Sequence, residues 1–356
     1  MDIERLSLET QTLHAELLER LCVREAQRNI GALEGTFTVK TIHGNDYAYF
    51  LHYLPGGGRI NISLGRMSPA IEGLIAQHRE GRCDVATDVI GIRELSAQIK
   101  AGKAAVADPA TAKVVRELEV GGIFRVGGIL VGTLAFACIG NLLGAVWDRT
   151  TLVTRDIDFA FERTVSIAVP NVTADVPKSI ESLAMGFFPI PRLNPKHPST
   201  SFTIRKSPLR IDLLTPRMGS QGEEPVYIPR LKAAAQPLPY LDYLFEDPVR
   251  GAVINGEATL VLIPHPIRFA LHKLIVSQER EPAAEAKKQK DLWQAFQLLS
   301  FLEQERPEDI EPAWEDLVSR GPKWQRRAIA GLTMMERRFG KFAPAESLRR
   351  RAAQAE

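Results

Sequence analysis

Cysteine is scarce in this 356-residue sequence, which contains three thiols at Cys22, Cys83 and Cys138. They are too few and too widely spaced for a disulfide framework or a CxxC metal site, and such thiols are typical of a reducing compartment. The first 21 residues also lack the basic start and the unbroken apolar stretch of a signal peptide. We therefore expect a cytoplasmic protein.

A strong net charge is missing too. The 45 lysines and arginines nearly balance the 43 aspartates and glutamates, leaving +2. This balance excludes a uniformly basic nucleic-acid coat and an acidic tail protein, so any electrostatic function must be local. The composition, 45% apolar and 25% charged, is that of a folded globular protein. Its length suggests two to three domains, at about 150 residues each.

Long apolar runs are absent with one exception, residues 126–146, which contain no charged side chain. Twenty-one residues are enough to cross a bilayer. However, the run contains five glycines and Asn141, and an alternating strand pattern follows it closely. We predict a buried core helix and no membrane segment, with a membrane helix as the alternative.

The first 120 residues are predicted to form a helical region with a small β-meander. Apolar spacing predicts a helix over residues 7–30, and three β-rich runs follow at 36–42, 47–53 and 59–64. Ser68 and Pro69 suit a helix start. We expect the segment that follows, to about residue 118, to be helical with breaks near Gly81 and Pro109.

The remaining chain is predicted to contain two further units. Residues 121–235 alternate strand-like and helix-like runs, which is an α/β (α+β) pattern. Residues 236–356 show mainly helical periodicity, with helices over 268–279, 284–304 and 323–338. The sequence contains neither a Walker-type phosphate loop nor a nucleophile elbow.

Two acidic residues alternate along a predicted strand in the sequence TRDIDFAF. Asp156 and Asp158 fall on one face, and apolar residues fall on the other. Neighbouring carboxylates repel each other, so their pairing makes most sense if a divalent cation such as Mg²⁺ lies between them. A solvated strand face that carries two acids is the alternative.

A third carboxylate, Asp212, lies in the apolar strand-like run LRIDLLTP. An unpaired carboxylate there would be costly to bury, so Asp212 needs a partner. A neighbouring strand that brings it beside Asp156 and Asp158 would give three carboxylates for two metal ions. Such a cluster serves in-line phosphoryl or nucleotidyl transfer.

Gly127 and Gly128 stand between a short apolar run and a helix-like one. Glycines in this position allow backbone amides to approach a triphosphate at a helix N-terminus. Glycines in such a position serve tight packing more often than phosphate binding. Only their place ahead of the two aspartates favours phosphate binding here.

The order of these motifs, Gly-Gly, then Asp-x-Asp, then a strand-borne Asp, resembles the DNA polymerase β nucleotidyltransferase superfamily. GGILVGTLAF, TRDIDFA and LRIDLLTP are similar to a bacterial nucleotidyltransferase-like family of unknown substrate. The resemblance implies a polymerase-β-type core with a helix-plus-meander N-terminal region and a helical C-terminal domain.

The resemblance also implies roles for individual residues. Asp156 and Asp158 would bind two Mg²⁺ or Mn²⁺ ions, and Asp212 would bind the catalytic ion and help to deprotonate a hydroxyl. Gly127 and Gly128 would hold the NTP phosphates through backbone N–H groups, because Gly128 replaces the serine that many relatives carry.

A toxin branch of the superfamily carries a later Lys and Asp on a helix. Lys290 and Asp291 are the nearest match and would bind the nucleotide, although such a pair at a helix surface is usually just solvated.

The implied activity is transfer of a nucleoside monophosphate from an NTP to a hydroxyl of RNA or protein. Basic residues near Asp212 favour RNA, and so does the C-terminal stretch from residue 317, with ten lysines and arginines against three acids. A non-catalytic nucleotide- or RNA-binding module of a toxin–antitoxin or phage-defence system is the alternative. An antitoxin partner would fit either interpretation. The cluster near Asp212 consists of Arg192, Lys196, Arg205, Lys206, Arg210 and Arg217.

Overall fold

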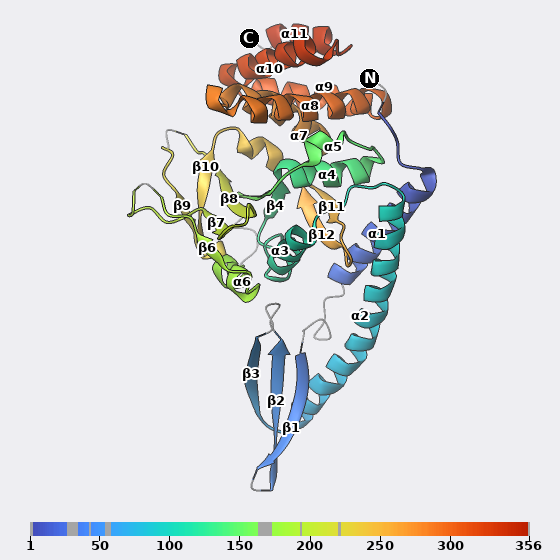
Figure 1. Cartoon of the computed structure of the whole chain (residues 1–356), viewed down its shortest axis with the longest axis vertical. Coiled ribbons are helices and arrows are strands. Elements are labelled where there is room, and N and C mark those ends of the chain that lie inside the picture. Colours follow the sequence, from blue (N-terminus) through green and yellow to red (C-terminus); the bar gives the residue numbers. More distant parts are fainter. Residues whose placement is uncertain are drawn as a thin grey trace.

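The computed structural model describes residues 3–26, 35–42, 44–53, 58–162, 173–192, 194–219 and 222–354. It is a mixed α/β structure with a central sheet, a layer of helices at its C-terminal end and an arm at the other end (Figure 1). The predicted fold class is confirmed. The predicted domain boundaries after residues 120 and 235 stay a prediction.

The arm consists of a three-stranded antiparallel sheet and a long helix. Ser68 caps the helix by accepting a hydrogen bond from the Ile71 amide, and Pro69 occupies its first turn. The helix continues through Gly81, so the predicted break there is wrong. The predicted start at Ser68 and the three predicted strands are confirmed. The elements are β1 (Gly35–Ile42), β2 (Asn45–Tyr53), β3 (Arg59–Arg66) and α2 (Pro69–Ala101).

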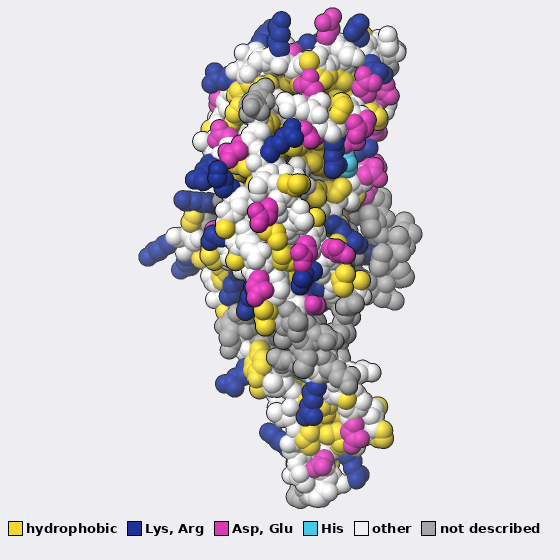
Figure 2. Space-filling model, turned by 90° about the vertical axis from the view of Figure 1, so that its right-hand side faces the viewer, with side chains coloured by type: hydrophobic (Ala, Val, Ile, Leu, Met, Phe, Trp, Pro, Cys, Tyr) yellow, Lys and Arg dark blue, Asp and Glu magenta, His cyan; other side chains and the backbone are white. Residues whose placement is uncertain are grey.

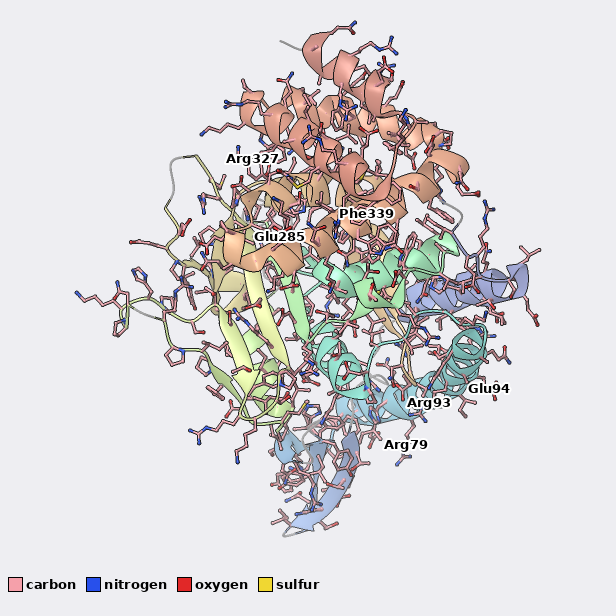
Figure 3. The ribbon with its side chains drawn as sticks, turned by 45° about the horizontal axis from the view of Figure 1, so that its top comes forward. Arg79, Arg93, Glu94, Glu285, Arg327 and Phe339 are labelled. Atoms are coloured by element: carbon pink, nitrogen blue, oxygen red, sulfur yellow. The ribbon has the colours of Figure 1, made fainter. Side chains whose placement is uncertain are left out.

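The base of the arm is fixed to the core by helix α1 (Leu8–Ala26) and the second half of α2. Leu17 and Leu21 of α1 pack with Ile92 and Leu95 of α2 in a separate apolar cluster. Arg93 of α2 also pairs with Glu257 of the core (Figure 3). The predicted end of the first helix, at residue 30, lies outside the described residues.

The central sheet has seven strands in the order β4-β5-β8-β10-β9, with β7 pairing to β8 and β6 to β7. Strands β5, β8 and β10 are parallel neighbours, whereas β4 and β9 are antiparallel at the two ends. The strands are β4 (Gly128–Val131), β5 (Asp156–Phe161), β6 (Phe187–Pro189), β7 (Ser201–Ile204), β8 (Arg210–Pro216), β9 (Val226–Ile228) and β10 (Ala233–Leu238).

One face of the central sheet is buried in the main core. Ile157 and Phe159 of β5 and Ile211 of β8 are at most 1% exposed on this face. Because side chains alternate along a strand, Asp158 and Asp212 point to the opposite face. Helices α3 (Pro109–Val120), α4 (Gly132–Leu143), α5 (Arg149–Leu152) and α6 (Val176–Ser182) surround the sheet.

The uncharged run over residues 126–146 is divided between two elements. Gly128–Val131 forms strand β4, and Gly132–Leu143 forms helix α4, which ends at Gly144 in the left-handed conformation. The prediction of one core helix is therefore wrong in its extent, since a buried strand and a buried helix are equally apolar. In the described part of the chain, no helix is long and apolar enough to cross a membrane.

The C-terminal layer is helical, as predicted, and several of its aromatic residues are partly buried and pack against the main core. Phe339 packs against Trp293, with ring centroids 4.7 Å apart (Figure 3). Trp324 packs against Tyr240. The helices are α7 (Pro266–Glu279), α8 (Glu285–Glu305), α9 (Ile310–Ser319), α10 (Pro322–Phe339) and α11 (Ala345–Gln354).

A β-hairpin that the sequence analysis did not predict precedes these helices. Strands β11 (Val249–Val253) and β12 (Thr259–Ile263) pair antiparallel and pack beside α4 and β4. The turn contains Asn255 and Gly256, and Gly256 adopts φ +59°. Asn-Gly between two apolar runs is a strong hairpin signal, so the hairpin could have been predicted.

Candidate active site

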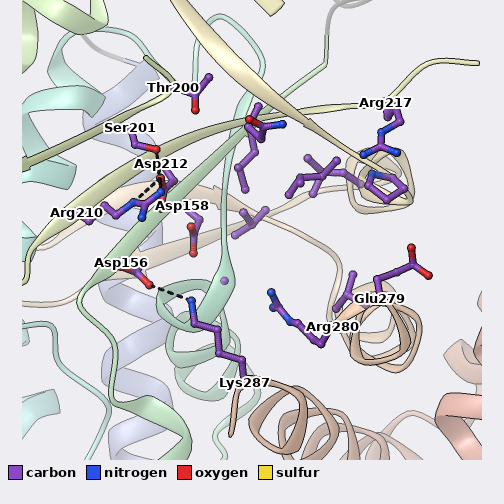
Figure 4. A pocket seen from close by; sticks show the side chains of 18 of the residues that line it. Asp156, Asp158, Thr200, Ser201, Arg210, Asp212, Arg217, Glu279, Arg280 and Lys287 are labelled. Atoms are coloured by element: carbon purple, nitrogen blue, oxygen red, sulfur yellow. Dashed lines mark hydrogen bonds and ion pairs between the residues drawn. The ribbon is translucent and has the colours of Figure 1, made fainter. Parts of the chain in front are cut away.

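A cavity of about 930 Å³ lies against the polar face of the central sheet. Its floor is made by β5, β8 and β10, and its opposite wall by α7 and α8. Figure 4 shows carboxylates and cationic side chains pointing into it from both sides. Such a concave site with convergent charged groups is the expected place for a substrate.

The three predicted carboxylates lie together in this cavity. Asp158 of β5 and Asp212 of β8 are directly in register on adjacent parallel strands. Asp156 lies two residues before Asp158 and therefore on the same face. A neighbouring strand thus brings Asp212 beside Asp156 and Asp158, as expected.

Two of the carboxylates are held by cations. Asp212 accepts hydrogen bonds from Arg210 Nε (2.8 Å) and from the Ser201 hydroxyl. Asp156 is more exposed and has Lys287 Nζ 4.0 Å away. These contacts are marked in Figure 4. Cationic groups thus occupy the space beside Asp156 and Asp212.

Asp158 lies in the least favourable environment for a negative charge. Burial raises the pKa of its carboxyl group to about 7, and the charges of Asp212 and Asp156 add to the shift. Lys273 and Lys287 oppose it only in part. A cation close to Asp158 would therefore be strongly favoured.

The donor set fits a divalent ion, since carboxylate oxygens are the ligands that Mg²⁺ and Mn²⁺ prefer. The raised pKa of Asp158 also indicates that a positive charge would be favoured beside this carboxylate. In the part of the chain that the structure describes, however, no three acidic, histidine or cysteine side chains converge closely enough to form a finished metal site. A metal ion would thus replace Arg210 and Lys287 as the partners of Asp212 and Asp156.

The structure does not bring Gly127 and Gly128 to the cavity. They lie at the start of β4, whereas the end of that strand reaches the carboxylates. A Cβ at Gly128 would approach the Phe161 ring to 2.5 Å, so this glycine permits close packing. Packing was the alternative that the sequence left open.

Gly132 and Thr133 line the cavity instead, at the N-terminus of α4. Gly132 has φ +71°, and a side chain there would collide with the Asp158 carboxylate. The sequence signal was the third glycine of GGILVGT, which a hydroxyl residue follows. Backbone N–H groups at the start of α4 therefore lie beside the carboxylates, where they can bind an anion.

Gly132→Ala is expected to lower the free energy of unfolding by about 1–2 kcal/mol and to abolish enzymatic activity, because the methyl group displaces Asp158. Gly186→Ala is a matched control, since Gly186 has φ +77° with no atom near its Cβ position. Thermal unfolding and activity assays of both variants test this. Equal activity in the two variants would contradict the assigned contact.

Lys290 and Asp291 both line the cavity, but Asp291 is not the solvated surface residue that the sequence suggested. It is 3% exposed and bound by Lys273 (2.6 Å) and Arg280 (2.9 Å). Burial raises the pKa of Asp291, and the two cations more than offset this, so the pKa lies below 3.8. Lys290 donates to the Val153 carbonyl, and burial lowers its pKa.

Lys273 is a site residue that the sequence analysis missed. It lies in the cavity wall on α7, 8% exposed, among apolar neighbours such as Phe269 and Ala270. A lysine on the apolar face of a helix was the available signal. The neighbouring His272 is also buried in the wall, where burial and Lys273 lower its pKa to about 3, so its ring is neutral.

The two predicted basic regions behave differently. Arg192, Arg210 and Arg217 of the first region line the cavity. In the C-terminal region many arginines form ion pairs within the helical layer, and its aromatic residues are packed. The basic C-terminal region therefore gives weaker support for a nucleic-acid surface than its sequence suggested. The paired arginines are Arg320, Arg327, Arg349 and Arg351.

A family model described as Nucleotidyltransferase matches residues 109–319, which is more than half of the chain. The chain belongs to this nucleotidyltransferase family. It is an enzyme that transfers phosphorus-containing groups. No curated protein and no solved structure matches the chain.

The matched region of the nucleotidyltransferase contains the whole described lining of the cavity, from Val131 to Asp291. It excludes the arm and the last two helices, α10 and α11. The match therefore covers the residues that line the cavity and leaves the arm outside it.

Proposed function

We propose that this nucleotidyltransferase moves a nucleoside monophosphate from an NTP to a hydroxyl group of RNA, as a member of the DNA polymerase β superfamily. Asp156, Asp158 and Asp212 would hold Mg²⁺ or Mn²⁺. The observation that carries the proposal is the register pairing of Asp158 with Asp212 opposite a wall of lysines.

The cationic wall suits the triphosphate. Lys273, Arg280 and Lys290 come from α7 and α8, and Lys287 lies one helical turn before Asp291. Placed between this wall and the N-terminus of α4, a triphosphate would have positive groups on both sides. The α-phosphate would then lie near the carboxylates.

The reaction is an in-line displacement. The acceptor oxygen forms a bond to the α-phosphorus, the bond from that phosphorus to the bridging oxygen breaks, and pyrophosphate leaves with the bonding electrons. Asp212 receives the proton of the attacking hydroxyl, and Lys273 and Lys290 stabilise the leaving pyrophosphate. A bound divalent ion would supply charge neutralisation and alignment of the reacting oxygens.

Basic side chains on the sheet side of the cavity favour a polyanionic acceptor. Arg192 is held by Thr200 and Gln236, and Arg217 lies close by in the same lining. Both side chains come from segments on the sheet side of the cavity, so an RNA 3′ end could enter beside them. Phosphate contacts of this kind make binding depend on salt.

The proposal is tested by incubating the protein with Mg²⁺, a cell extract and each NTP, labelled at the α- or the γ-phosphate. We expect the α-label to enter a macromolecule and the γ-label to leave with pyrophosphate. The labelled product should be destroyed by ribonuclease and survive protease. Survival in ribonuclease with loss in protease would identify protein as the acceptor, and transfer of the γ-label would contradict nucleotidyl transfer.

A further inference from the structure

The arm has an open sheet face with an unusual set of side chains. Its other face packs on α2, where His78 lies edge-on against the rings of Phe37 (4.9 Å) and Phe50 (5.6 Å). Since side chains alternate along a strand, the neighbours of Phe50 on β2, Tyr49 and Leu51, belong to the open face. Figure 1 shows no other labelled element beside this face.

Three tyrosines lie along the middle of the open face, with Leu51 between the second and the third. Tyr47, Tyr49 and Tyr53 lie on the central strand β2, on the same side. Tyr53 is 39% exposed, and the other two are half-buried. Aromatic rings in a row on an uncovered sheet offer flat surfaces on which unpaired bases can stack.

Cations flank the tyrosines, as the strand register shows. Tyr47 lies between Lys40 of β1 and Arg66 of β3, and Tyr53 lies opposite Arg59. Lys40 Nζ also lies 5.4 Å from the centre of the Tyr49 ring. These cations would contact phosphates while bases stack on the rings.

Acidic side chains are missing from the open face. The one acidic residue of these three strands is Asp46, which pairs with Thr41 on the α2 side and accepts its hydrogen bond (2.6 Å). Hydroxyl and amide side chains occupy the positions beside Tyr49 and Leu51, where they can bond a ribose 2′-hydroxyl. They are Thr36, Thr38, Asn61 and Ser63.

We propose that the open face of the β1–β2–β3 sheet binds single-stranded RNA. Charge complementarity and uncovered aromatic rings support this binding, and neither feature depends on the cavity. The suggestion that this RNA is the nucleotidyl acceptor rests on the function proposed above, but the binding does not. Figure 2 shows the arm extending beyond the body, where it can reach RNA at a distance from the cavity.

The test measures binding of a fluorescent single-stranded RNA by anisotropy, without NTP or metal. Tyr49→Leu, which keeps an apolar strand residue but removes the ring, should bind about tenfold more weakly. Tyr49→Phe should bind like the unaltered protein. Tyr227→Leu is the control, because Tyr227 is 58% exposed on β9, away from the arm. Circular dichroism checks that each variant is folded.

The cations are tested through the salt dependence of the same binding. Lys40→Gln with Arg66→Gln should reduce the slope of log affinity against log salt by about 1.4, since single strands give about 0.7 per phosphate. The matched control is the double variant Arg338→Gln with Lys341→Gln, whose two side chains are exposed on the C-terminal layer. An unchanged slope in the arm variant would overturn the proposal.

The outcomes separate this proposal from the function proposed for the cavity. If RNA binding disappears in the arm variants while NTP transfer is undetectable, RNA binding by the arm is supported and nucleotidyl transfer in the cavity is rejected. If transfer is active and the arm variants bind RNA as tightly as the unaltered protein, RNA binding by the arm is rejected. Equal affinity for DNA of the same sequence, or saturable binding of a protein partner to this face instead, would overturn the assignment to RNA.

Discussion

Asp158→Asn is expected to reduce nucleotidyl transfer about a thousandfold or more, because it removes the central carboxylate of the proposed metal site. Binding of Mn²⁺, followed by calorimetry, should weaken in parallel. Glu285→Gln on α8 is the control, since this acid lies outside the described cavity lining. Transfer within a few-fold of the unaltered protein would contradict the role of Asp158.

The same variant should be more stable than the unaltered protein in metal-free buffer. The pKa of Asp158 is raised from 3.8 to about 7, so the ionised carboxylate destabilises the folded state above pH 7. That cost shrinks as the pH falls toward 3.8. We therefore expect the melting temperature to rise by a few degrees at pH 8 and by less at pH 5. A large fall would return Asp158 to a structural role.

Asp291→Leu is expected to lower the free energy of unfolding by about 3–5 kcal/mol, because it leaves the buried Lys273 without its partner. Transfer should be lost as well, since Lys273 lines the cavity. The double variant Lys273→Met, Asp291→Leu should recover much of the stability but no activity. Urea denaturation measures the first effect and a transfer assay the second.

The pH dependence of this ion pair has a defined sign. The pKa of Asp291 lies below its ordinary 3.8, so the pair stabilises the folded state above that value and is lost in stronger acid. The stability difference between Asp291→Leu and the unaltered protein should therefore shrink below about pH 4. A difference that stays constant into acid would show that Asp291 acts through packing alone.

The sequence predicted the carboxylates because their patterns are local. Alternation alone puts Asp156 and Asp158 on one face, and an acid in an apolar strand needs a partner, which Arg210 and Ser201 provide for Asp212. The order of these motifs also predicted a nucleotidyltransferase family, which the family match confirms, whereas the polymerase β superfamily stays a prediction. A partner antitoxin stays a prediction.

What the sequence could not provide depends on contacts between distant segments. Lys273 and Asp291 meet only because α7 packs on α8, and no local pattern reveals this pairing. Within the uncharged run nothing marks where β4 ends and α4 begins, so Gly127 and Gly128 were predicted at the phosphate site and Gly132 was not. The collision of a Gly132 side chain with Asp158 becomes visible only when β4 and β5 are side by side.

The anchoring of the arm has an evolutionary consequence. Leu17 and Leu21 pack with Ile92 at the base, and every described residue that lines the cavity lies at or after Val131. We therefore expect that replacing the sheet at the far end would leave the base and the cavity intact. Relatives with the same catalytic core could then acquire new targets simply by grafting a different tip onto the two helices.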